Sequence, residues 1–166
     1  MNAPLRFALI AALAASLAPN AALADLKSEM SAFVVTEDAT GTERYVPADS
    51  VAPGQTIEYR MVHTNAFDHA IAGVTVLGPV PENSTLDPAY LRSDVPALLE
   101  VRGDFDPDRA GEEWSALPAW RTVIAPDGTR TTEEARPEHF TAVRWRLDGA
   151  MASAASVTHA YRVTVE

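Results

Sequence analysis

Apolar and polar residues alternate with a period of two over several runs of this chain. Between residues 57 and 64, one face carries Ile57, Tyr59, Met61 and His63, and the other carries Glu58, Arg60, Val62 and Thr64. This alternation is typical of an antiparallel strand with one buried face. The same pattern recurs at residues 30–35, 143–147 and 157–165, whereas no long window has the period of an amphipathic helix.

Shorter runs at residues 44–47, 73–77, 85–90, 98–102 and 120–125 are predicted as further strands. Turn signals stand between them, at Pro53-Gly54, Gly78-Pro79 and Pro126-Asp127-Gly128. The acidic segment 104–113 is predicted as a loop, and no strand is predicted in the polar segment 129–138. About seven strands joined by short turns predict an all-β fold, a single antiparallel β-sandwich domain over residues 25–166.

The first 24 residues have the three-part pattern of a secretory signal peptide. Arg6 is the only charge before Asp25, an apolar run follows at residues 7–17, and Ala22-Leu23-Ala24 forms a small-x-small cleavage site. The apolar run of about eleven residues is shorter than the ~20 needed to cross a bilayer. The sequence therefore predicts a signal peptide at 1–24 and a mature chain without a membrane span. The bias toward arginine and alanine favours a bacterial source, so we expect a periplasmic or secreted protein.

Composition and charge exclude several classes of function. The 166 residues carry 13 basic and 23 acidic side chains, a formal net charge of −10, and no cysteine. A nucleic-acid partner is not expected, because phosphate contacts need a basic surface. The lack of cysteine excludes disulfides, thiolate metal sites and cysteine nucleophiles. The acidic excess is interpreted as a source of solubility for a β-rich surface.

Several segments resemble the bacterial Domain of Unknown Function Eleven family, also called the conserved repeat domain. They are residues 51–59 with the element Pro53-Gly54 before Tyr59, then 72–76, 78–84, and 140–147 with Arg144-Trp145. The similarity covers residues 27–166 and departs from the family pattern at 65–69 and 106–114. It implies an immunoglobulin-like module of an exported or cell-surface protein, and it implies no catalytic residues.

Two histidines are candidate metal ligands. His63 and His159 both fall on the apolar faces of their predicted strands. Imidazole pairs bind copper or zinc when a third ligand completes the site, and Met61, Asp68 and His69 are the nearby choices. The alternative is that both histidines are hydrogen-bonded residues of the core.

A second candidate is a calcium-binding loop. Asp104, Asp106 and Asp108 occupy alternate positions, followed by Glu112 and Glu113. Calcium takes six to eight oxygen ligands, and carboxylates two residues apart can converge on one ion. The EF-hand template fails, however, because Arg109 and Ser115 stand where it requires glycine and glutamate. The alternative is a solvated acidic loop.

No catalytic pattern is present in the sequence. It contains no Gly-x-Ser-x-Gly, no His-Glu-x-x-His and no glycine-rich phosphate loop, so we do not expect an enzyme. Trp114 and Trp120 are expected either to line a ligand groove or to cap the sandwich. Arg144, Arg146 and Arg162 are expected to point outward and to pair with Glu58 or other carboxylates across the strands.

The sequence thus predicts a non-enzymatic exported β-sandwich module with a structural or protein-binding role. Its expected partner is an envelope protein or another β-sandwich. The alternative function is a small periplasmic protein that binds copper, zinc or calcium.

Overall fold

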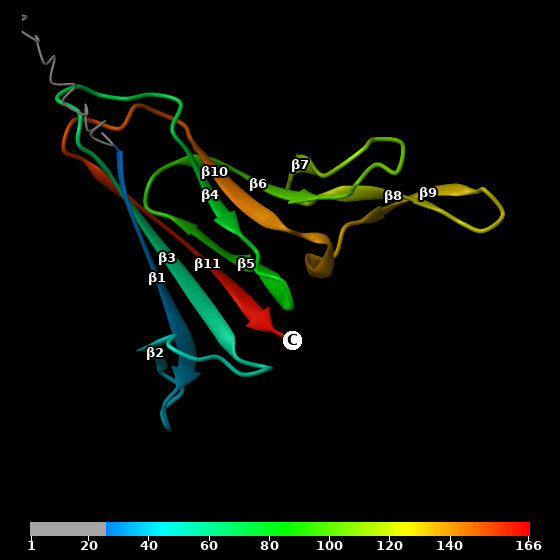
Figure 1. The fold of residues 1–166 in the computed structure, drawn as a ribbon, viewed down its shortest axis with the longest axis horizontal. Coiled ribbons are helices and arrows are strands. Elements are labelled where there is room, and N and C mark those ends of the chain that lie inside the picture. The colour runs from blue at the N-terminus through cyan, green and yellow to red at the C-terminus, as the bar shows by residue number, and fades with distance from the viewer. Residues whose placement is uncertain (1–25) are drawn as a thin grey trace, which may run out of the picture.

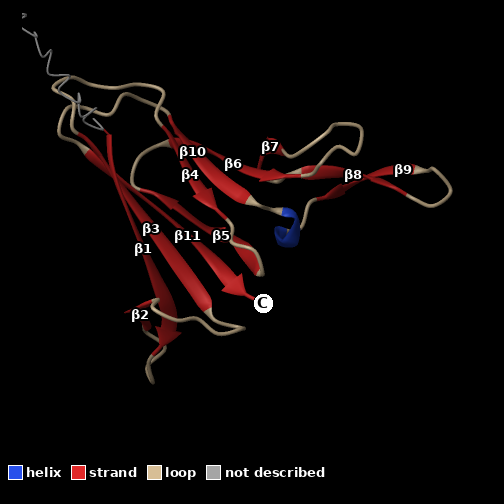
Figure 2. Cartoon of the chain, in the orientation of Figure 1, coloured by secondary structure: helices blue, strands red, loops and turns tan. Residues whose placement is uncertain are grey.

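The computed structural model describes residues 26–166. The predicted signal peptide at 1–24, and Asp25 after it, lie outside the described residues. The elements are β1 (Leu26–Glu37), β2 (Glu43–Pro47), β3 (Thr56–Asn65), β4 (Thr75–Pro79), β5 (Ser84–Ser93), β6 (Ala97–Gly103), β7 (Glu113–Ala116), β8 (Trp120–Ile124), β9 (Arg130–Glu134), the 3-10 helix η1 (Pro137–His139), β10 (Ala142–Leu147) and β11 (Ser156–Val165). Strands therefore dominate the described part of the chain (Figure 2).

These strands form two main antiparallel sheets and a small two-stranded one. The larger sheet has the order β2-β1-β3-β11-β5, the smaller sheet has the order β4-β10-β6-β7, and β8 pairs with β9. The two larger sheets do not close into a barrel. The β8-β9 hairpin, which we call the arm, projects away from them (Figure 1).

The core lies where β10 of the smaller sheet packs over β11 of the larger one. Trp145 on β10 is 2% exposed and Tyr161 on β11 is fully buried, with their ring centroids 6.1 Å apart. The alternation predicted at 143–147 buries Val143 and Trp145, as expected. Apolar side chains from the inner faces of both sheets fill the space around these rings, which is the usual core of a sandwich.

The predicted antiparallel β-sandwich is confirmed. The last two strands are central, because β11 lies between β3 and β5 and β10 lies between β4 and β6. In the constant-type immunoglobulin order the last two strands share one sheet, whereas here they lie in different sheets. The architecture is thus the predicted one, and the strand order differs from that immunoglobulin type.

Each predicted strand range overlaps a strand of the structure, including the short edge strand β2, but the turn predicted at Gly78-Pro79 is wrong, because both residues pair with β10 as part of β4. Two strands were not predicted, β7 after the acidic loop and β9 in the polar segment 129–138. Within residues 26–166, no helix has the length and apolar character needed to cross a membrane.

Candidate functional site

The two histidines that the sequence places on apolar faces lie side by side. His63 on β3 and His159 on the neighbouring β11 have ring centroids 6.0 Å apart at an interplanar angle of 77°. His159 is only 1% exposed, and its ring centroid lies 5.1 Å from that of Trp145 in the opposite sheet. The pair therefore lies on the inner face of the larger sheet, against the core.

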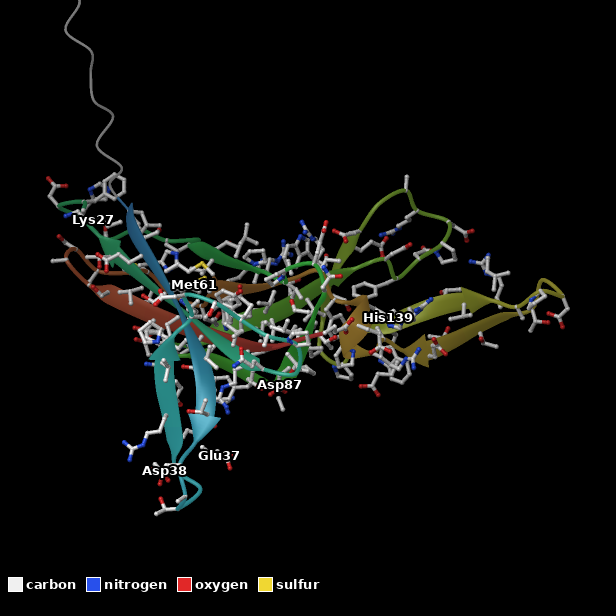
Figure 3. All side chains as sticks on the ribbon, turned by 60° about the horizontal axis from the view of Figure 1, so that its bottom comes forward. Lys27, Glu37, Asp38, Met61, Asp87 and His139 are labelled. Carbon is white, nitrogen blue, oxygen red and sulfur yellow. The ribbon has the colours of Figure 1, made fainter. Side chains whose placement is uncertain are left out.

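Two methionines extend this pair into a row across three strands. Met61 on β3 is directly opposite His159 on β11 and, on its other side, directly opposite Met30 on β1. Opposed residues of an antiparallel pair share one face, with Cβ atoms about 4.5–5.5 Å apart. Met61 is buried and Met30 is 52% exposed, and Figure 3 labels Met61 on its strand. We call Met30, Met61, His63 and His159 the histidine–methionine cluster.

The cluster lies at an open side of the sandwich. A hollow of about 190 Å³ is lined by Ser28, Glu29, Met30, Met61, His63 and Leu77. Leu77 belongs to β4, the edge strand of the smaller sheet, and is 57% exposed. The hollow therefore opens between that edge and the first strands of the larger sheet. His159 does not line it and is enclosed by the core.

The imidazoles of the cluster are held in a neutral state. Burial lowers the pKa of His159 to about 4, with a further contribution from the neighbouring His63, and burial also lowers the pKa of His63. Within residues 26–166, Nδ1 of His63 and both ring nitrogens of His159 are buried and have no hydrogen-bond partner. A neutral imidazole always carries one N–H, so an unpartnered buried ring costs about 1–3 kcal/mol. His159 is therefore a core residue, as the alternative expected, but without the expected hydrogen bond among residues 26–166.

The other predicted ligands do not complete this pair with a third histidine or carboxylate. His69 and Asp68 contact each other, with 2.9 Å between the ring nitrogen and the carboxylate oxygen, and both are exposed. In the described part of the chain, no three His, Asp or Glu side chains lie close enough together to hold a metal ion. Met61 is the predicted third ligand that the structure places beside the pair.

The three predicted calcium ligands lie in the loop between β6 and β7. Asp108 accepts two hydrogen bonds from Arg130, at 2.6 and 3.3 Å, and Asp106 lies 3.7 Å from Arg109. Asp104 follows Gly103 at the end of β6 and is exposed. Two of the three carboxylates thus have arginine partners, which compensate the charge that would attract calcium. The calcium site stays a prediction, and these contacts do not favour it.

Sequence reasoning did not identify a charged cluster on the outer face of the larger sheet. Glu58 is 1% exposed and bonds Arg60 at 2.5 Å and Arg162 at 2.9 Å. Arg162 also bonds both carboxylate oxygens of Glu43 on β2, each at 2.7 Å, and its guanidinium lies 3.5 Å from the centre of the Tyr90 ring. Only the cross-strand pairing of Arg162 with Glu58 was expected, and it is confirmed.

Ionisation of Glu58 depends on this cluster. Burial opposes it, but hydrogen bonds from Arg60, Tyr90 and Arg162 outweigh burial and hold the pKa of the carboxyl below its usual value. On β2, hydrogen bonds from Arg162 and Tyr45 lower the pKa of Glu43 to about 2. The cluster therefore consists of charged groups with their partners in place. It joins strands and offers no free group for catalysis.

The two tryptophans of the middle segment have different surroundings. Trp114 on β7 is half-buried beneath the guanidinium of Arg144, which lies 4.3 Å from the ring centre. Arg144 in turn bonds Glu100 on the adjacent strand at 2.7 Å. Trp120, by contrast, lies on the arm and is 55% exposed. Trp114 thus covers the outer face of the smaller sheet, and Trp120 neither lines a groove with it nor caps the sandwich.

The comparisons with known proteins found no relative. The chain matches no protein-family model, and no curated protein has a similar sequence.

Proposed function

We propose that this chain is a non-enzymatic, exported β-sandwich module that binds another protein through its arm. The observation that carries the proposal is a pair of exposed apolar side chains on the arm, Trp120 and Ile124. Trp120 and Ile124 are four residues apart on β8, so they project from the same face, and they are 55% and 47% exposed. Exposed aromatic side chains of this kind supply much of the binding energy in protein interfaces.

The arm is held firmly at its base. Backbone hydrogen bonds join Thr122 to Phe105 at 2.8 Å and Ala135 to Ala119 at 2.8 Å. Arg121 projects from the other face of β8 and contacts His139 of the 3-10 helix. An isolated two-stranded hairpin is only marginally stable in water, so these contacts account for its order. They also leave the face with Trp120 directed away from the sandwich.

Charge indicates what kind of partner this face would accept. The chain has a net charge of −10, so an acidic partner would be repelled over long range. We therefore propose a partner, such as an envelope protein or another β-sandwich, whose contact surface is apolar at its centre and neutral or basic around it. From the predicted signal peptide, we propose that the encounter takes place outside the cytoplasm.

The proposal is tested by using the exported, purified chain as bait to capture proteins from envelope extracts. The variant carrying Trp120→Ser and Ile124→Ser is compared with the wild type and with Leu98→Ser, since Leu98 is 48% exposed outside the arm. We expect one partner to be retained by the wild type and by Leu98→Ser and to be lost with the arm variant. If no captured protein depends on the arm, the proposal is wrong.

Sedimentation velocity on the same three proteins separates a foreign partner from a second copy of this chain. If the purified wild type associates with itself and the arm variant does not, the partner is another copy of this chain. If all three proteins are monomers and capture still depends on the arm, the partner is a different protein.

A further inference from the structure

We propose that the histidine–methionine cluster binds one monovalent copper ion, Cu(I), through Met30, Met61, His63 and His159. This site is separate from the arm, and the proposal is independent of the protein-binding function. The arm variant described above leaves every residue of the cluster unchanged, so either proposal can fail without the other.

The first argument is the state of the two imidazoles. His159 is 1% exposed and neither of its ring nitrogens has a partner among residues 26–166, and the buried Nδ1 of His63 also has none. Two imidazoles with free nitrogens, whose centroids are 6.0 Å apart in an apolar wall, lack the hydrogen bonds that buried polar groups normally make. Metal coordination would use these nitrogens, and it requires the neutral form that burial favours here.

The second argument is the identity of the neighbouring donors, which selects the metal. The residues in line with the histidines are Met30 and Met61, whose thioether sulfurs are soft donors. Thioethers favour Cu(I), imidazole suits copper and zinc, and carboxylates favour hard cations. Glu29 lines the hollow, but it does not form a group of three with the two histidines. The available set is therefore two sulfurs and two nitrogens, which Cu(I) accepts and calcium does not.

The third argument is access. The hollow of about 190 Å³ opens to solvent beside Met30, which is 52% exposed, and it reaches Met61 and His63. An ion would meet the exposed thioether of Met30 first and then Met61 and His63; His159 does not line the hollow and lies beside Met61 on the neighbouring strand.

The proposal is tested by anaerobic titration of the purified full chain with Cu(I), using the chromophoric chelator bicinchoninate as the competitor. We expect one Cu(I) per chain. Met30→Leu, Met61→Leu and His63→Gln should each weaken retention against the chelator by at least about 10-fold, the scale on which changes at metal sites act. The matched controls Met151→Leu and His69→Gln lie outside the cluster and should retain Cu(I) like the wild type.

Met30→Leu is the decisive variant, because Met30 is half exposed and the change preserves its volume, so the fold is unaffected. Circular dichroism and urea unfolding check this for each variant. X-ray absorption of the Cu(I) protein should show sulfur as well as nitrogen ligands. Loss of Cu(I) to the chelator by the wild type, or retention that is unchanged in Met30→Leu and Met61→Leu, would overturn the proposal. So would binding of Zn²⁺ in preference to Cu(I).

Discussion

At Gly78 the two sheets approach so closely that no side chain fits between them. A Cβ atom at this position would lie 2.7 Å from the ring of Tyr161. That ring cannot move aside easily, because it is fully buried, stacks on Tyr59 at 5.0 Å and donates a hydrogen bond of 2.7 Å from its hydroxyl to the carbonyl of Pro79. The glycine therefore fixes the distance between β4 and β11.

Gly78→Ala should destabilise the chain by about 1–3 kcal/mol, the usual range for overpacking a core. The free energy of unfolding is measured by urea denaturation with circular dichroism. The matched control is Gly149→Ala, because a Cβ at Gly149 meets no atom within 4 Å. Equal stability of the two variants would show that the sheets move apart without cost.

Much of the candidate site could be predicted at the level of single residues. Period-two alternation placed His63 and His159 on buried faces, and both lie there. Their proximity follows from the pairing of β3 with β11, two strands that are about a hundred residues apart in sequence. The role of Met30 could not be predicted in the same way, because its pairing with Met61 depends on the register between β1 and β3. The contact between Arg130 and Asp108 could likewise not be predicted from the sequence.

Among the elements, β2 depends most on side chains from elsewhere in the sheet. Its backbone pairs only with β1, and all five of its residues are exposed. Arg162 on β11 reaches Glu43 on β2 and Glu58 on β3 at once, with contacts of 2.7 and 2.9 Å. Because the Arg162 side chain is 10% exposed and that of Glu58 is 1% exposed, this ion pair is poorly screened by solvent. Arg162 therefore joins the edge strand to the centre of the sheet.

Arg162→Met should destabilise the chain by about 3 kcal/mol, because it leaves the buried Glu58 with one fewer cationic partner. Hydrogen exchange should show the largest loss of protection in the amides of β2 and the adjoining part of β1. Arg44→Met serves as the control, since Arg44 pairs with Asp38 on the surface, and surface pairs contribute less than about 1 kcal/mol. Uniform loss of protection over the whole larger sheet would contradict a specific role at β2.

The strands could be predicted where burial on one face imposes alternation. β3, β10 and β11 satisfy that condition, and their predicted ranges agree with the structure to within one or two residues. β9 does not, because all five of its residues are exposed and it is ordered by pairing with β8. β7 pairs only with β6 and is four residues long, and so short a run does not show a periodic pattern. The distribution of strands between the sheets depends on long-range pairing and has no local signal.

For the molecule as a whole, the buried histidines couple stability to pH. The pKa of His159 falls from the ordinary 6.5 to about 4 on folding, mainly through burial and secondly through His63, while Asp94 opposes the change. The unfolded chain therefore takes up a proton before the folded chain does. Above pH 6.5 His159 is neutral in both states, and the free energy of unfolding decreases as the pH falls from 6.5 toward 4. The lowered pKa of His63 acts in the same direction.

We expect metal-free protein to lose about 2 kcal/mol of its free energy of unfolding between pH 7.5 and pH 5 through His159. The carboxylates with lowered pKa values have ordinary values of 3.8 for aspartate and 4.5 for glutamate, so their protonation acts mainly below this interval; they are Asp38, Glu43, Glu58, Asp68, Glu100 and Asp127. Urea unfolding at half-unit steps of pH measures the slope. His159→Gln should reduce the slope to the part that His63 contributes, whereas His69→Gln, at an exposed loop position, should leave it as in the wild type. A wild-type stability that is constant over this interval would mean that the folded chain accommodates a charged His159, and the inner face of the larger sheet would then be open to water.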